Sequence, residues 1–201
     1  MDAAASSSGE ICYGLIKSLG AKIDKETALC LYSAICADTG GFKYSNTTPK
    51  KLLIAADLLE CGIDVAKINK LLFDTESYNE MCLKGEIASK VEIYCNGLVG
   101  VVYATKDMLQ SYGINDKEVD NIVDIARRVD GVEVAVSIKE SDSIIKVSLR
   151  SSEYIDVSKI AESFGGGGHV RASGFVMKEK FEIAKKKIID EVIKTVKEYK
   201  R

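Results

Sequence analysis

The chain has 201 residues, of which 46% are hydrophobic and 29% charged, and its formal net charge is −2. These values are typical of a soluble globular protein and allow one large domain or two small ones. A chain so close to neutrality has no broad positive field for a long nucleic acid, so an anionic ligand must be met by a local group of basic residues. The composition therefore favours a short or small substrate.

Cysteine and histidine usage argues against a zinc site. The six cysteines form no Cys-x-x-Cys pair, and the chain has a single histidine. The N-terminus lacks the basic and apolar regions of a signal peptide, and no apolar run approaches the about 18 residues of a membrane-spanning helix. We therefore predict a cytoplasmic protein, in a reducing compartment, without a membrane partner.

Apolar residues at helical spacing dominate the first part of the chain. They predict helices over residues 3–19, 25–37, 50–60, 64–73 and about 77–90. Thr48 and Pro49 mark the start of the third of these, because proline is favoured at the first helical position. We expect this helical part to end near residue 88, so the predicted domains are 1–88 and 89–201.

The second domain is predicted to be mixed α/β. Its patterns predict strands at 91–94, 98–105, 132–139 and 145–150, and helices at 107–112, 116–128 and 180–201. Asn96-Gly97 is a strong hairpin signal between the first two strands. In the last helix, interleaved acidic residues favour a packed helix with a solvated face over a nucleic-acid or membrane helix. The expected fold class is α/β, a helical part followed by a mixed sheet.

Residues 164–175 contain four consecutive glycines. They follow a short predicted helix, which Asp156 can cap and Gly165 can end. Because glycine adopts positive φ at no steric cost, the run could turn several N–H groups toward one anion. The alternative is a flexible linker, but linkers usually have polar neighbours, whereas this run lies between a capped helix and an apolar strand-like segment. No Gly-Lys-Ser/Thr follows, so the run is not a P-loop.

Two charged residues elsewhere are candidates for ligand binding. Asp38 follows a buried helix and precedes a glycine pair, and from these residues alone a backbone-capping role is favoured over a metal-binding role. Arg150 ends an alternating strand beside Ser151 and could offer a bidentate fork to a phosphate. The alternative for Arg150 is an ordinary surface arginine.

Three blocks of the chain resemble the DHH-family phosphoesterases. Residues 165–174, Gly-Gly-Gly-Gly-His-Val-Arg-Ala-Ser-Gly, resemble the GGGHxxAAG signature of the DHH-associated domain, which closes the active site in that family. Residues 37–49, from Ala-Asp-Thr-Gly-Gly-Phe to Ser-Asn-Thr-Thr-Pro, resemble its last metal-binding motif. Residues 2–10 are similar to the segment just beyond its DHH triplet. The nearest subgroup is the bacterial nanoRNase and 3′-phosphoadenosine 5′-phosphate phosphatase branch.

The resemblance implies a manganese-dependent phosphodiesterase or phosphatase that acts on short RNA or DNA oligonucleotides, dinucleotides or nucleoside bisphosphates. It makes Asp38 the last aspartate ligand of a manganese pair, since carboxylate oxygens suit manganese and two metal ions can stabilise the attacking and leaving oxygens. Residues 148–151 match the family's SxRS substrate-contacting strand end. The residues implied to bind substrate are Arg150, Ser151, Gly166, Gly167, Gly168, His169 and Arg171.

The other metal motifs of the family are not matched, so we interpret the chain as the C-terminal, truncated portion of such an enzyme and expect it to be inactive alone. One alternative is a nucleotide-binding or nucleic-acid-binding module without hydrolytic activity of its own. Another is a structural or partner-binding domain with a vestigial loop. Apolar surface on residues 3–37 is expected to drive homo-oligomerisation. His169 and Arg171 can bind one ligand only if both side chains face it. A structure in which Arg171 points away from His169 would remove Arg171 from the predicted site.

Overall fold

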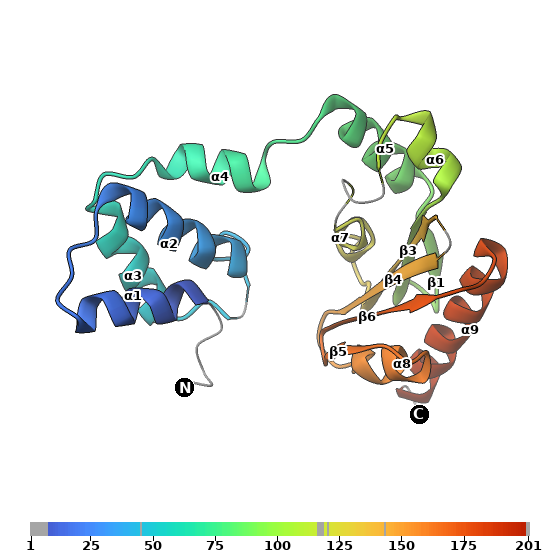
Figure 1. The fold of residues 1–201 in the computed structure, drawn as a ribbon. Coiled ribbons are helices and arrows are strands. Elements are labelled where there is room, and N and C mark those ends of the chain that lie inside the picture. Colours follow the sequence, from blue (N-terminus) through green and yellow to red (C-terminus); the bar gives the residue numbers. More distant parts are fainter. Residues whose placement is uncertain (1–7, 45, 116–118, 120, 143, 200–201) are drawn as a thin grey trace. The chain divides into compact units, whose positions relative to one another are not determined.

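The chain divides into two compact units, Met1–Thr75 and Glu76–Arg201 (Figure 1). The computed structural model describes residues 8–44, 46–115, 119, 121–142 and 144–199. The sequence predicts a boundary after residue 88, whereas helix α5 (Tyr78–Ser89) packs within the second unit, because its Leu83 and Ile87 join a core of that unit. None of the helices in the described residues is both long and apolar enough to cross a membrane.

The first unit consists, in its described residues, of helices joined by capped turns. Its helices are α1 (Ser8–Ser18), α2 (Lys25–Asp38), α3 (Pro49–Leu59) and α4 (Val65–Phe73). Asp24, Thr48 and Asp64 each accept a side-chain hydrogen bond from a backbone N–H in the first turn of the helix that follows. The helix predicted over residues 3–19 lies partly outside the described residues, while α2 to α5 confirm the predicted helices to within one residue at each end.

Apolar side chains remain exposed on the helices of the first unit. Ile11, Leu15 and Leu19, spaced one helical turn apart, are 52%, 58% and 73% exposed. On α3, Leu52 and Leu53 are 50% and 72% exposed. Groups of exposed apolar side chains commonly mark surfaces that associate with another molecule.

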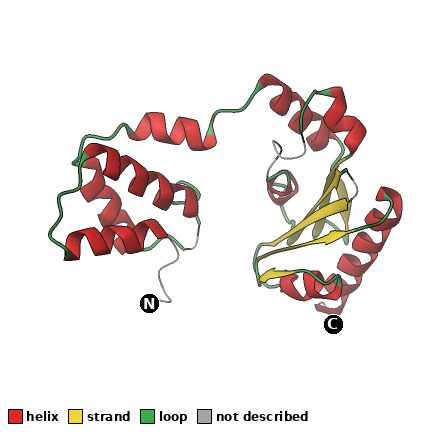
Figure 2. Cartoon of the chain, in the orientation of Figure 1, coloured by secondary structure: helices red, strands yellow, loops and turns green. Residues whose placement is uncertain are grey.

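The second unit is a mixed sheet with helices packed on both of its faces (Figures 1 and 2). Its described strands are β1 (Glu92–Tyr94), β2 (Val99–Ala104), β3 (Val134–Ser141), β4 (Ile144–Ser151), β5 (Gly167–His169) and β6 (Ala172–Met177), in the order β1-β2-β3-β4-β6-β5. β2 and β3 run parallel, and the other neighbours are antiparallel. Its other helices are α6 (Lys106–Ser111), α7 (Val123–Arg127), α8 (Val157–Ser163) and α9 (Phe181–Tyr199). The α/β class is confirmed; α7 covers only the end of the helix predicted over 116–128, part of which lies outside the described residues.

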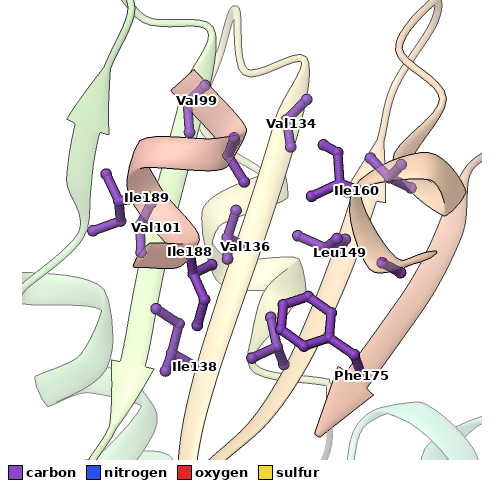
Figure 3. Packing of buried hydrophobic residues seen from close by; sticks show 14 of the residues in the cluster. Val99, Val101, Val134, Val136, Ile138, Leu149, Ile160, Phe175, Ile188 and Ile189 are labelled. Atoms are coloured by element: carbon purple, nitrogen blue, oxygen red, sulfur yellow. The ribbon is translucent and has the colours of Figure 1, made fainter. Parts of the chain in front are cut away.

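Strand alternation divides the sheet into an apolar face and a face of smaller residues. On the apolar face, α8 and α9 pack over the branched side chains of β2, β3 and β4 (Figure 3). On the other face α7 packs over β2 and β3, where a Cβ added at Gly100 would lie 3.2 Å from the Ala126 Cβ. Farther along this second face, β4 and β5 carry the two candidate residues Arg150 and His169.

We expect the purified chain to self-associate through the exposed apolar side chains of α1 and of Leu19, which directly follows it. Light scattering at high concentration should give a mass above the 21.9 kDa of one chain. Replacing both Leu15 and Leu19 by glutamate should lower that mass, because an interface would have to desolvate the new charges. The control, Val176→Glu, changes a 53% exposed residue of the second unit and should leave the mass unchanged. A monodisperse monomer of the unmodified chain contradicts the expectation.

Candidate functional site

Arg150 and His169 project from the same face of the sheet. Arg150 of β4 pairs with Ala172 of β6, and Ala172 pairs in turn with His169 of β5. Directly paired residues of antiparallel strands share a face, and their Cα atoms are about 5 Å apart. The backbones of Arg150 and His169 are therefore about 10 Å apart, with only the methyl group of Ala172 between the two side chains.

Small residues occupy the sheet surface next to Arg150, Ala172 and His169. Ser148, Gly174 and Gly167 make the adjacent cross-strand row, and residues two apart on a strand share a face. A Cβ at Gly174 would lie 2.7 Å from the Val147 carbonyl oxygen, so close strand packing excludes a larger residue there. We call the surface made by Ser148, Arg150, Gly167, His169, Ala172 and Gly174 the Arg150–His169 strip.

Both end residues of the strip keep donor groups that a ligand can use. Arg150 is half-buried, and its Nη1 donates a hydrogen bond to the Leu149 carbonyl oxygen at 3.0 Å. His169 is exposed, and neither side chain forms an ion pair with another described residue. A guanidinium has five N–H donors and an imidazole has two ring nitrogens, so the strip can hold an anionic ligand from both ends.

The glycine run ends α8 and leads into β5. Asp156 caps α8 by accepting the Ser158 N–H at 3.0 Å, and the hydrogen bond from the Ser158 side chain is the main cause that lowers the pKa of the Asp156 carboxyl. At the other end, Gly165 has a φ of 75°, and the Gly166 N–H donates to the Ala161 carbonyl oxygen at 2.9 Å. Both the cap and the C-terminal glycine that the sequence predicts are confirmed.

Close packing explains two of the glycines that follow, Gly166 and Gly168. A Cβ at Gly166 would lie 2.3 Å from the Phe175 Cβ, and one at Gly168 would lie 2.6 Å from the Ala172 carbonyl oxygen. Of the four glycines, only Gly165 and Gly168 have positive φ, at 75° and 144°. The four glycines are therefore not an uninterrupted run of left-handed residues, and anion binding by their N–H groups stays a prediction. Gly166 and Gly168 let β5 lie close to β6 as an exposed edge strand.

Arg171 and Ser151 belong to the opposite face of the sheet. Arg171 Nη1 donates to the Ile155 carbonyl oxygen at 2.9 Å and to the Ser151 hydroxyl oxygen at 3.4 Å. Ser151 is 4% exposed, and its N–H donates to the Arg171 carbonyl oxygen at 3.1 Å. Ser151 follows Arg150 in β4, so strand alternation directs it to the side that α8 covers. Arg171 lies in the turn between β5 and β6, and its two hydrogen bonds hold its side chain on that same side. Arg171 therefore points away from His169 and is removed from the predicted substrate-binding residues. Ser151 is hydrogen-bonded to Arg171 rather than exposed on the strip.

Asp38 belongs to the first unit, at the end of α2. Its Oδ2 is 3.2 Å from the Asn46 amide nitrogen and 3.6 Å from the Lys51 ammonium, whose side chain is 1% exposed. The Asn46 Oδ1 is buried without a hydrogen-bond partner among the described residues. Carboxylate and amide oxygens suit manganese, but no group of three or more His, Cys, Asp or Glu occurs in the described part of the chain. Those residues do not by themselves provide the ligands of a metal pair.

Comparison with known families identifies the second unit. A family model described as the DHHA1 domain matches residues 96–198, about half of the chain, and this range contains the whole Arg150–His169 strip. The chain belongs to the DHHA1 domain family. The predicted resemblance to the DHH-associated part of a DHH phosphoesterase is thereby confirmed.

Curated relatives extend the match beyond the DHHA1 domain. The bifunctional oligoribonuclease and PAP phosphatase NrnA of Thermus thermophilus is 32% identical over 179 residues, which cover 89% of this chain and 53% of the relative. The protein of that name from Bacillus subtilis is 32% identical, covering 87% and 56%. The crystal structure of an exopolyphosphatase-related protein from Bacteroides fragilis is 28% identical with a TM-score of 0.88, covering 98% and 58%. The chain spans about half the length of the curated relatives it matches.

Glu133 is a residue of the DHHA1 domain that sequence reasoning did not select. Alternation in the strand predicted over residues 132–139 places it on the polar side, yet in the structure it precedes β3 and is 4% exposed. Its carboxylate accepts backbone hydrogen bonds from residues 153–155. No local pattern distinguishes such a carboxylate from one at the surface, because its partners begin 20 residues later in the chain.

Two neighbouring glycines of the DHHA1 domain allow a matched test of the close packing. We expect Gly166→Ala to destabilise the fold by about 1–3 kcal/mol, because its Cβ would collide with Phe175 and with the Gly174 carbonyl oxygen. Gly167→Ala is the control, since nothing lies within 4 Å of its Cβ, and its stability should change little. Urea unfolding midpoints measure both effects. Equal midpoints for the two variants would show that the close approach at Gly166 is not required.

Proposed function

We propose that the chain is the substrate-phosphate-binding portion of a phosphodiesterase or phosphatase that acts on short oligoribonucleotides or nucleoside bisphosphates. The observation that carries this proposal is the cross-strand row in which Arg150 and His169 flank Ala172. The names of the relatives, oligoribonuclease and PAP phosphatase, support the substrate class. The net charge of −2 supports a small ligand, because the cations available to it are local.

The two ends of the strip are proposed to hold different phosphates of one ligand. His169 hydrogen-bonds the scissile phosphate, and Arg150 holds the remote one with its planar fork. A backbone separation of about 10 Å suits a ligand with two phosphates, because both side chains can reach inward over Ala172. The exposed edge strand at Gly167 and Gly168 offers backbone groups beside the ligand.

Manganese dependence is part of the same proposal. Asp38, together with the neighbouring Asn46 amide, supplies oxygen donors of the kind that manganese prefers. The described residues contain no group of three or more metal-ligating side chains, so further ligands must come from outside them. Asp38 is thus proposed as one ligand of a site that other parts of the enzyme complete, in the cytoplasm.

A binding module without hydrolysis of its own is the second candidate. The observation that favours it is the same lack of a group of three or more His, Cys, Asp or Glu in the described part of the chain. In this case the isolated chain binds a nucleotide along the strip but does not cleave it.

Incubating the purified chain with manganese and an RNA dinucleotide separates the two candidates. We expect binding without turnover, because one carboxylate does not hold two divalent ions. The control is an Asp38→Asn chain in the same buffer, which should behave identically. Turnover above the buffer background that disappears in the Asp38→Asn chain would reject the binding-only candidate.

Removing either end of the strip should weaken nucleotide binding. We expect Arg150→Ala and His169→Ala each to raise the Kd for a nucleoside 3′,5′-bisphosphate about tenfold to a hundredfold, the effect of losing one charge-assisted hydrogen bond. Lys186→Ala, which removes an exposed cation of α9 on the other face, is the control and should leave the Kd unchanged. Calorimetry gives the Kd. Unchanged affinity in both strip variants would favour a structural or partner-binding domain with a vestigial loop.

A further inference from the structure

A buried carboxylate ties down the loop that follows β4. Glu133 is 4% exposed, and its Oε1 accepts hydrogen bonds from the N–H groups of Tyr154 and Ile155, both at 2.8 Å. Its Oε2 accepts one from the Glu153 N–H at 3.0 Å. Three consecutive N–H groups directed at one point form an anion-binding nest, and here the chain's own carboxylate fills it. Residues 152–155, which we call the clamp loop, are thereby attached to the residue that precedes β3.

An arginine holds the clamp loop from its other side. Arg171 Nη1 donates to the Ile155 carbonyl oxygen at 2.9 Å and to the Ser151 hydroxyl oxygen at 3.4 Å. In return, the Ser151 N–H donates to the Arg171 carbonyl oxygen at 3.1 Å, and the Val157 N–H donates to the Val170 carbonyl oxygen at 3.0 Å. Val170 and Arg171 form the turn that joins β5 to β6. Hydrogen bonds therefore connect the clamp loop to this turn.

We infer that Glu133 and Arg171 are positioning residues that set the separation of Arg150 and His169. The inference rests on the proposed function, in which these last two side chains bind one ligand. Arg150 lies two residues before the clamp loop, and His169 lies two residues before Arg171. β5 is an exposed edge strand of three residues, so strand pairing alone holds His169 weakly. The hydrogen bonds from the clamp loop to Glu133 and to Arg171 supply the missing restraint on the position of His169.

The charge of Glu133 is central to this restraint, because an ionised acceptor binds an N–H group about twice as strongly as a neutral one. Glu133→Gln keeps the shape and can keep the two bonds at Oε1, but it turns an NH2 group toward the Glu153 N–H. Arg171→Lys keeps the charge but replaces the guanidinium, whose Nη1 donates to both Ile155 and Ser151, by an ammonium on a differently shaped side chain. Glu153→Gln is the matched control, since it makes the same chemical change on an exposed residue of the same loop.

The test compares two ligands that differ by one phosphate, a nucleoside 3′,5′-bisphosphate and a nucleoside 5′-monophosphate. Correct spacing of Arg150 and His169 makes the unmodified chain prefer the bisphosphate. We expect Glu133→Gln and Arg171→Lys to reduce this preference, measured as the ratio of the two Kd values, about tenfold, and Glu153→Gln to retain it. A merely structural loss would lower both affinities by the same factor and leave the ratio unchanged.

The imidazole of His169 supplies a second readout, because it is the only histidine in the chain and its NMR ring signals need no assignment. Adding the bisphosphate should shift these signals less in Glu133→Gln than in the unmodified chain. A folded Glu133→Gln chain with the unmodified Kd ratio and the unmodified signal shift overturns the inference. Where Glu133→Gln does not fold, Arg171→Lys decides by the same two criteria.

Failure of the proposed function can be distinguished from failure of the positioning role of Glu133 and Arg171. If Arg150→Ala and His169→Ala leave the binding of both ligands unchanged, the strip is not the ligand site, and the inference is overturned together with the proposed function. If those variants weaken binding while the clamp variants keep the Kd ratio, the proposed function stands and only the positioning role is rejected.

Discussion

The backbone pairing of β4, β6 and β5 is the constraint on which the candidate site depends. It places Arg150 and His169 on one face of the sheet, on either side of the small Ala172. Because side chains alternate along a strand, a slip of one residue would turn one of them to the opposite face. Close contacts hold this register, since neither Gly166 nor Gly174 has room for a Cβ. Close packing at Gly166, Gly168 and Gly174 thus helps to place the histidine.

Charged residues around this sheet fall into two groups with different roles. Glu133 and Arg171 bind backbone groups and the Ser151 hydroxyl, through hydrogen bonds of 2.8–3.4 Å that join three loops. Arg150 and His169 keep donor groups on the face of smaller residues. A chain with a net charge of −2 can therefore present a local positive strip without a broad positive field. The hydrogen-bonded Glu133 and Arg171 give this strip a defined shape rather than additional charge.

The two units divide the candidate residues between them. The second unit, which contains the DHHA1 domain, carries the Arg150–His169 strip. The first unit carries Asp38 beside the buried Lys51 ammonium. An ammonium at 3.6 Å gives this carboxylate a counter-charge from within the chain. The relatives are about twice as long as the matched region, which agrees with the proposal that further metal ligands lie outside the described residues.

Local sequence patterns by themselves determined helices α2 to α5, the caps at Asp156 and Gly165, the alternating strands and the likeness to the DHH-associated domain. These features depend on residues only a few positions apart, so spacing and residue type are enough to predict them. Only the tertiary structure decided that Arg150 and His169 share a face, that Arg171 turns away from them, and that Glu133 is buried. The physical reason is that strand register and buried hydrogen bonds join segments far apart in the chain, and no local pattern records which segments will meet.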